Sequence, residues 1–253
     1  MDWVGYSNRC TAGVSNGLSK DGGFSEYAVV DARQIAPLPD ELDAIDAAPL
    51  MCAGVTIYNA LKKCNLKTGQ RVGIVGCGGG LGHLGLQFAD AMGIQTLGVD
   101  AADGPLEIAK SLKTRAQIID ARTQQADDVV KLLGEKDGKT DRADMGLDAV
   151  IILPESQASF DYGMQLLRNH GLCVVVSFPE KGFQLSARDL VFRDISVIGT
   201  MLGSNEILRE MVEFAGKHGI KAVKKTYSLD KLNELVDEYN KGGGGKLVVD
   251  MSL

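Results

Sequence analysis

The sequence predicts an α/β fold organised as a doubly wound parallel sheet. Short apolar runs alternate with helical patterns from Arg71 onward. A glycine cluster separates the first apolar run from the first helix, and the second run ends in a single acid, Asp100. Strand, glycine turn, helix and strand in this order form a βαβ unit, in which a crossover helix joins two parallel strands.

The glycine cluster directly follows the apolar run of residues 72–75. A strict GxGxxG pattern begins only at Gly80, too far into the helix, whereas the strand leads into a GxxGGxG variant formed by Gly76, Gly79, Gly80 and Gly82. Glycine lets the backbone turn sharply and lets main-chain N–H groups approach a pyrophosphate at a helix N-terminus. The pattern therefore predicts dinucleotide binding, with a tight turn in a sheet protein as the other interpretation.

Asp100 lies at the tip of the second predicted strand. A carboxylate at this place accepts hydrogen bonds from both hydroxyls of an adenosine ribose and repels a 2′-phosphate. We therefore expect NAD rather than NADP.

The remaining elements continue the alternation. Strands are predicted near residues 71–75, 95–99, 116–119, 148–153, 171–178 and 195–201. Helices are predicted near residues 82–92, 104–112, 123–134 and 157–168. Right-handed crossovers in such a sheet place ligand sites at the carboxyl ends of the strands.

Both ends of the chain depart from this alternation. Residues 1–22 lack periodicity and predict an irregular loop, whereas residues 24–36 alternate in β-rich residues and predict a strand. Two helices are expected next, one leading to Cys52 and one over residues 55–62. The tail predicts helices over residues 206–218 and 229–240, a short strand between them, a flexible glycine turn at 242–245 and a final strand.

The net charge of −6 argues against a nucleic-acid-binding surface, which requires a basic face. No segment has the pattern of a signal peptide or the length of a membrane span, so we expect no membrane partner. Five cysteines without a CxxC pair do not suggest a disulfide framework. These features predict a soluble, cytoplasmic protein.

Six segments carry a resemblance that extends over nearly the whole chain. They are DGGFSEYAVV, APLMCAGVTIYNALK, GCGGGLGHLG, LGVDAADG, VVVSFP and GGKLVVD. In this order they resemble the medium-chain zinc-dependent alcohol dehydrogenases, especially the yeast and bacterial ethanol-dehydrogenase branch. The resemblance implies a Rossmann sheet and hydride transfer between a small alcohol or aldehyde and NAD.

The resemblance also implies residue roles. Binding of the pyrophosphate is assigned to Gly76, Gly79, Gly80, Leu81 and Gly82. The acid that binds the adenosine ribose is Asp100. Thr56 is placed near the nicotinamide, and main-chain groups of Val176, Ser177 and Phe178 near its carboxamide. Lys246 replaces the family's phosphate-binding arginine, which keeps the charge but loses the bidentate fork.

Cys52 matches the family's last catalytic zinc ligand. The family's β-rich GroES-like lobe, which precedes DGGF and supplies the other ligands, is expected to be truncated here. The three histidines, His83, His170 and His218, all lie in or after the nucleotide-binding half and do not easily replace the missing ligand. The structural-zinc spacing is also broken: with Cys10 as its third cysteine, the other positions hold Val4, Ser7 and Leu18. Cys52 is therefore either a zinc ligand or a small buried thiol. Cys64, Cys77 and Cys173 are expected in the core or in turns, and His83 is expected on the helix surface rather than as a catalyst.

The implied division is a catalytic-lobe remnant at residues 1–54, an NAD-binding Rossmann domain at 55–202 and a C-terminal segment at 203–253 that returns to the lobe. A homo-oligomer is expected to form through the edge strand around residues 195–202. Two alternatives to an NAD-dependent alcohol dehydrogenase stay open: a non-catalytic NAD(H)-binding remnant, and a zinc-free reductase of the quinone or enoyl type. An S-adenosylmethionine methyltransferase fits the glycine turn but not the six segments.

Overall fold

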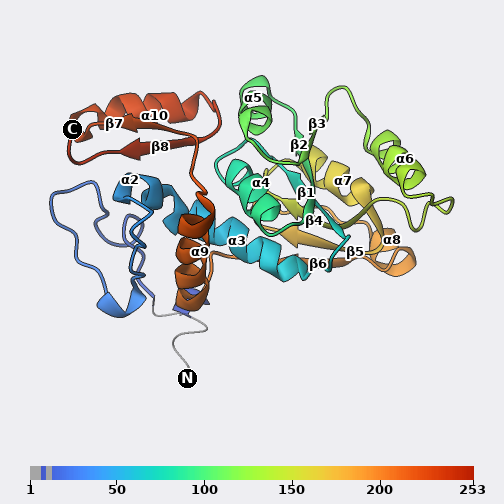
Figure 1. Cartoon of the computed structure of the whole chain (residues 1–253), viewed down its shortest axis with the longest axis horizontal. Helices are drawn as coiled ribbons and strands as arrows, with labels where there is room; N and C mark the ends of the chain where they lie inside the picture. Colours follow the sequence, from blue (N-terminus) through green and yellow to red (C-terminus); the bar gives the residue numbers. More distant parts are fainter. Residues whose placement is uncertain (1–6, 10–12) are drawn as a thin grey trace.

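Six parallel strands form the central sheet, in the spatial order β3-β2-β1-β4-β5-β6 (Figure 1). The computed structural model describes residues 7–9 and 13–253. The strands are β1 (Arg71–Val75), β2 (Gln95–Asp100), β3 (Gln117–Asp120), β4 (Leu147–Ile152), β5 (Leu167–Val175) and β6 (Ser196–Gly199). The order reverses between β1 and β4, which is the doubly wound arrangement that the sequence predicts.

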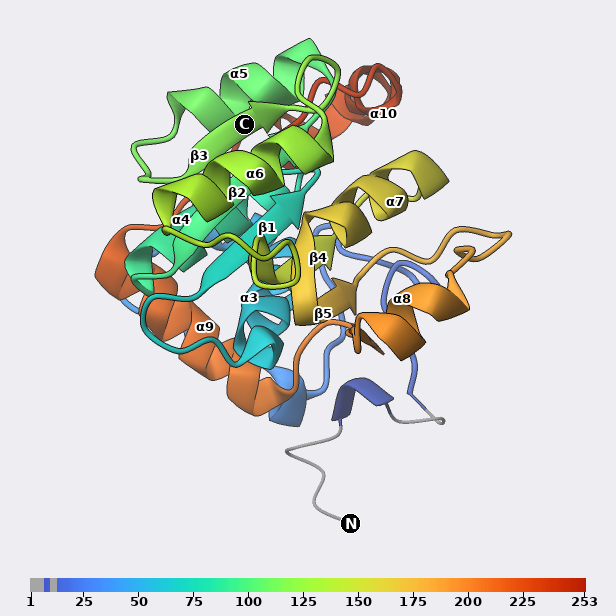
Figure 2. The same cartoon turned by 90° about the vertical axis from the view of Figure 1, so that its right-hand side faces the viewer.

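Helices cover both faces of the sheet (Figure 2). One face carries α3 (Ala53–Cys64), α4 (Gly82–Ala91) and α5 (Asp103–Ser111), and the other carries α6 (Ala126–Lys136) and α7 (Gln157–Leu166). Side chains alternate along β4, so that Ala149 and Ile151 pack with α3 and α4 while Val150 and Ile152 pack with α7. Because both faces of the central strands are buried, β1 and β4 are almost continuously apolar.

The predicted strands and crossover helices are confirmed, with most ends within three residues. The short helix α8 (Ala187–Phe192) was not predicted; the hydroxyl of Ser186 accepts a hydrogen bond from the Arg188 N–H at its start. Six residues with no buried side chain give too little periodicity for a prediction from sequence.

The strand predicted over residues 24–36 is wrong. Residues 24–31 have no regular structure, and a 3₁₀ turn, η2 (Ala32–Gln34), follows them. Tyr27 and Val29 are 89% and 94% exposed. A β-strand needs a neighbour to pair its backbone groups, and within the described residues no strand lies beside this segment.

The N-terminal and C-terminal parts of the chain pack together beside the sheet (Figure 1). The former comprises η1 (Ser7–Arg9), α2 (Ala44–Ala47) and η3 (Ala48–Met51). The latter comprises α9 (Asn205–His218), β7 (Lys224–Tyr227), η4 (Leu229–Lys231), α10 (Leu232–Asn240) and β8 (Lys246–Val249). Strands β7 and β8 form a separate parallel pair, and β8 contacts η3.

An acid of α2 joins these two parts. Asp46 is only 3% exposed and forms ion pairs with Lys221, at 2.5 Å, and with Lys224. On α9, Glu210 accepts hydrogen bonds from Tyr58 and Lys62 of α3. The segment 203–253 is thereby fixed both to α2 and to the helices of the sheet.

Among the described helices, no single one has the length and apolar character needed to cross a membrane; one bent pair, Ala44–Met51 with Ala53–Cys64, meets the criterion by length and composition only.

Candidate functional site

The glycine turn between β1 and α4 is closely packed. Gly76 has a φ of +82°, which favours glycine, and the N–H groups of Gly76 and Cys77 both donate to the Val99 carbonyl of β2. A Cβ on Gly78 would lie 1.8 Å from the Pro105 carbonyl oxygen, and one on Gly82 would lie 2.1 Å from the Gly76 oxygen. Gly78 was absent from the predicted site residues, although it lies inside the glycine cluster.

The start of α4 presents free main-chain donors. The N–H of Gly79 donates a hydrogen bond to the Gly76 carbonyl at 3.2 Å. The N–H groups of Gly80 and Leu81 have no acceptor in residues 7–9 and 13–253. Leu81 is the N-cap residue of α4 and has no side-chain cap. A helix N-terminus with unpaired N–H groups binds anions through these donors and the helix dipole.

Asp100 ends β2 beside this turn. Its Oδ2 accepts a hydrogen bond from the Gly78 N–H at 3.0 Å, and its Oδ1 accepts one from the Ala101 N–H at 2.9 Å. These bonds fix the carboxylate relative to the glycine turn. The neighbouring cation, Arg122, is paired with Asp103 and Asp120 and so offers little free positive charge to a 2′-phosphate.

Lys246 lies next to the glycine turn at Gly80. A Cβ on Gly80 would lie 3.1 Å from Lys246 Cδ and 3.4 Å from its Nζ. The backbone N–H of Lys246 donates to the Val223 carbonyl at 2.9 Å, which fixes the start of β8. The structure thus places Asp100 and Lys246 at the same glycine turn, and their roles in cofactor binding stay predictions.

The glycine run at 242–245 forms the expected turn, and its flexibility stays a prediction. Gly242, Gly244 and Gly245 have positive φ values of 70°, 81° and 65°. A Cβ on Gly244 would lie 3.0 Å from the Gly78 carbonyl oxygen. Gly244 and Gly245 therefore lie against the glycine turn, which brings Lys246 next to it, whereas Gly242 and Gly243 are exposed.

His83 was expected on the helix surface, but its side chain is fully buried. Its Nδ1 lies 2.8 Å from the Gly79 carbonyl oxygen, and its Nε2 lies 3.1 Å from the Val223 nitrogen. No local sequence pattern predicts that His83 is buried, because its contact with Val223 joins residues 140 positions apart.

The residues assigned to the nicotinamide follow the carboxyl ends of the central strands or lie on α3. The Val176 N–H already donates to the Ile152 carbonyl, and Ser177 Oγ donates to the Pro154 carbonyl at 2.8 Å. Phe178 is 87% exposed. Thr56 is nearly buried, and its hydroxyl donates to the Cys52 carbonyl at 2.6 Å. Val176 therefore has only its carbonyl free, while the roles of Thr56, Ser177 and Phe178 stay predictions.

Cys52 is the N-cap residue of α3 and is exposed, so it is not the buried thiol that one hypothesis described. In the part of the chain that the structure describes, no three His, Cys, Asp or Glu side chains cluster as metal ligands. These residues therefore do not fit a catalytic zinc.

The other cysteines of the described chain lie in the core. Burial raises the pKa of Cys64, Cys77 and Cys173 to about 12, so they are protonated thiols at neutral pH. Cys10 and Val4, on which the structural-zinc spacing depends, lie outside the described residues.

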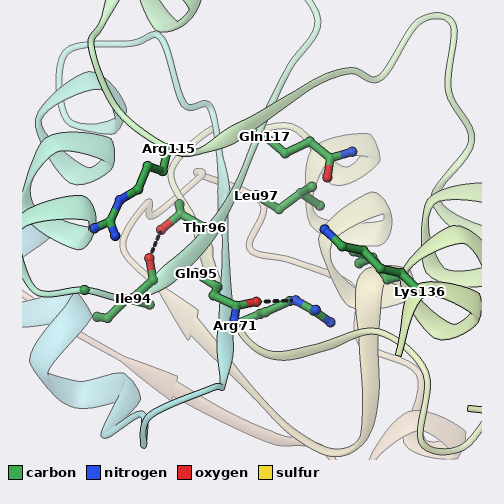
Figure 3. A pocket seen from close by; sticks show the side chains of 10 residues that line it. Arg71, Ile94, Gln95, Thr96, Leu97, Arg115, Gln117 and Lys136 are labelled. Carbon is green, nitrogen blue, oxygen red and sulfur yellow. Dashed lines mark hydrogen bonds between the residues drawn. The ribbon is translucent and has the colours of Figure 1, made fainter. Parts of the chain in front are cut away.

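A cavity of about 350 Å³ opens at the other edge of the sheet, near the amino ends of β1, β2 and β3 (Figure 3). Two of its cations already have partners, because Arg71 pairs with Asp137 and Arg115 pairs with Asp90. None of the predicted site residues lines this cavity. The glycine turn lies at the opposite, carboxyl edge, where ligands bind in open α/β sheets.

Comparison with known proteins gives consistent matches. The family model described as zinc-binding dehydrogenase matches residues 80–217. An alcohol dehydrogenase of Geobacillus stearothermophilus is 33% identical over 238 residues, which is 94% of this chain and 67% of the relative. Alcohol dehydrogenase 1 of Neurospora crassa is 32% identical over 245 residues, covering 96% of this chain and 67% of the relative.

Solved structures agree with the sequence matches. The alcohol dehydrogenase of the hyperthermophilic archaeon Aeropyrum pernix superposes with a TM-score of 0.76 at 29% identity, over 91% of this chain and 66% of that protein. The chain thus spans about two thirds of the length of the relatives that it matches.

Proposed function

This chain belongs to the zinc-binding dehydrogenase family, and from that premise we propose that it is an NAD-dependent oxidoreductase acting between an alcohol and its carbonyl product. One observation carries the proposal. The free N–H groups of Gly80 and Leu81 belong to the same turn that Lys246 approaches at Gly80 and that Asp100 flanks. Anion donors, a cation and a ribose acceptor at one sheet edge match the chemistry of a dinucleotide.

In this proposal the pyrophosphate binds over the glycine turn, where Gly80 and Leu81 donate main-chain hydrogen bonds and Lys246 supplies positive charge. Asp100 accepts the ribose hydroxyls. Gly76 and Gly82 give the turn its shape. The nicotinamide then extends toward the end of β5, where Thr56 and the main chain of Val176, Ser177 and Phe178 orient it. NAD supplies the hydride acceptor when bound, and the chain's residues position it.

Cys52 is the proposed zinc-ligand position by family resemblance, but we assign no step to zinc because the described residues do not fit it. This ligand count favours a second function, NAD(H) binding without turnover; a zinc-free reductase is the remaining alternative. Zinc content and alcohol-dependent NADH formation, measured on one sample, separate the zinc-dependent alcohol dehydrogenase from the binding-only function. Turnover with stoichiometric zinc would exclude the binding-only function.

We expect Asp100→Asn to weaken NADH binding about tenfold and to narrow the preference for NADH over NADPH, since the carboxylate is replaced by a neutral amide. Isothermal titration with both nucleotides measures the change. Asp128→Asn, which removes an exposed charge on α6, is the matched control and should leave both affinities unchanged. Unaltered binding of both nucleotides by Asp100→Asn would contradict the ribose assignment.

We also propose that 1–54, 55–202 and 203–253 are the domain units and that two copies pair through the edge strand β6. Ile198 and Met201 are 37% and 50% exposed along this edge, and an unpaired edge offers free backbone groups to a second strand.

Light scattering is expected to give the mass of a dimer, and Ile198→Lys is expected to give a monomer because a charge interrupts the pairing edge. Leu132→Lys, at an exposed position on α6, is the control and should stay dimeric. A monomeric unaltered chain would rule out this interface.

A further inference from the structure

His83 is a buried side chain that connects the glycine turn with the C-terminal unit. The Gly79 carbonyl can only accept, so Nδ1 carries the ring proton and donates to it. The Val223 N–H can only donate, so Nε2 accepts from it. Both ring nitrogens are satisfied only in the neutral Nδ1–H tautomer, and burial correspondingly lowers the pKa of His83.

The second of these bonds leads directly to Lys246. Val223 lies one residue before β7, and its carbonyl accepts the hydrogen bond from the Lys246 N–H. The Lys246 side chain then returns to the turn at Gly80. His83, Val223 and Lys246 thus close a path that begins at Gly79 and ends at the neighbouring Gly80.

From this geometry we propose that His83 is a positioning residue of the cofactor site, which sets the place of Lys246 relative to the phosphate-binding N–H groups. It does not touch the cofactor itself. The inference rests on the proposed NAD(H) binding and deepens it, because it explains how Lys246, near the C-terminal end of the sequence, is held in position beside the glycine turn after β1.

Two substitutions separate the two bonds of the ring. Asparagine at position 83 has its polar atoms near the place of Nδ1, so it retains the bond to Gly79 but does not reach Val223. Glutamine is longer by one methylene, and its Oε1 replaces Nε2 as the acceptor for the Val223 N–H. The positioning role therefore predicts that His83→Gln preserves the affinity for ADP better than His83→Asn.

The test is isothermal titration with ADP, which contains the pyrophosphate, and with adenosine, which lacks it. His83→Asn is expected to weaken ADP binding about tenfold and to leave adenosine binding unchanged, and His83→Gln is expected to restore most of the ADP affinity. In a Lys246→Ala background, His83→Asn should cause no further loss, because the cation that it positions is gone.

Equal losses of ADP affinity in both backgrounds, or equal losses for adenosine and ADP, would show that His83 only supports the fold and would overturn the proposal. Failure of the unaltered chain to bind ADP and NADH would instead overturn the proposed function, and this inference with it. Nitrogen-detected NMR of His83 at pH 7 gives a readout that needs no nucleotide. It should show a neutral ring protonated at Nδ1, and an imidazolium or an Nε2–H tautomer would contradict the geometry.

Discussion

Gly78→Ala is expected to abolish NADH binding and to lower the free energy of unfolding by about 3 kcal/mol. The new Cβ would lie 1.8 Å from the Pro105 carbonyl oxygen and 2.5 Å from the Pro105 Cα, so the obstacle is backbone and cannot rotate away. Either α5 or the glycine turn must move. Movement of the turn breaks the hydrogen bond from the Gly78 N–H to Asp100, which removes both the ribose acid and the phosphate donors from their places.

The neighbouring substitution Gly79→Ala is the matched comparison for stability. Its Cβ would lie 3.4 Å from the Gly76 carbonyl oxygen, at an ordinary contact distance. We expect its free energy of unfolding to change by less than about 1 kcal/mol. Urea unfolding of both variants, followed by circular dichroism, measures the difference. Equal stabilities for the two variants would contradict the close packing of the turn on α5.

Asp46→Asn is expected to lower the free energy of unfolding by about 2 kcal/mol at pH 7, because it leaves Lys221 and Lys224 without their shared carboxylate. Both lysines are partly exposed, which keeps the loss below that of a fully buried pair. Burial raises the pKa of Asp46, but the hydrogen bonds from Lys221 and Lys224 outweigh burial, so the pKa lies below its ordinary value.

This pKa direction fixes the pH dependence. A carboxyl whose pKa is lower in the folded state stabilises the fold above its unfolded pKa, and this contribution is lost as the pH falls through the folded pKa. The stability difference between the unaltered chain and Asp46→Asn should therefore be full at pH 7 and shrink below about pH 3.8. Urea unfolding across this range measures it. Asp40→Asn, at an exposed position in the turn before α2, is the control. A stability difference between the unaltered chain and Asp46→Asn that grows toward acidic pH would contradict the ion-pair assignment.

The strands and helices around the sheet could be predicted because their signals are local. Each central strand is a short apolar run, and each crossover helix has its own periodicity. The glycine turn could be predicted for the same reason, since strand, glycines and helix follow one another directly. The segment 24–36 shows the limit of such reasoning. Its composition suits a strand, but Tyr27 and Val29 have no neighbouring strand in the described structure to make one.

The sequence by itself therefore determined the doubly wound sheet, the position of the glycine turn and the acid at Asp100, because neighbouring residues encode all three. Only the tertiary structure decided that His83 is buried, that Gly244 lies against Gly78, and that Asp46 meets Lys224. The bonded pairs here are 140 and 178 residues apart. Contacts at such separations depend on how completed elements pack, and no local pattern of residues specifies that packing.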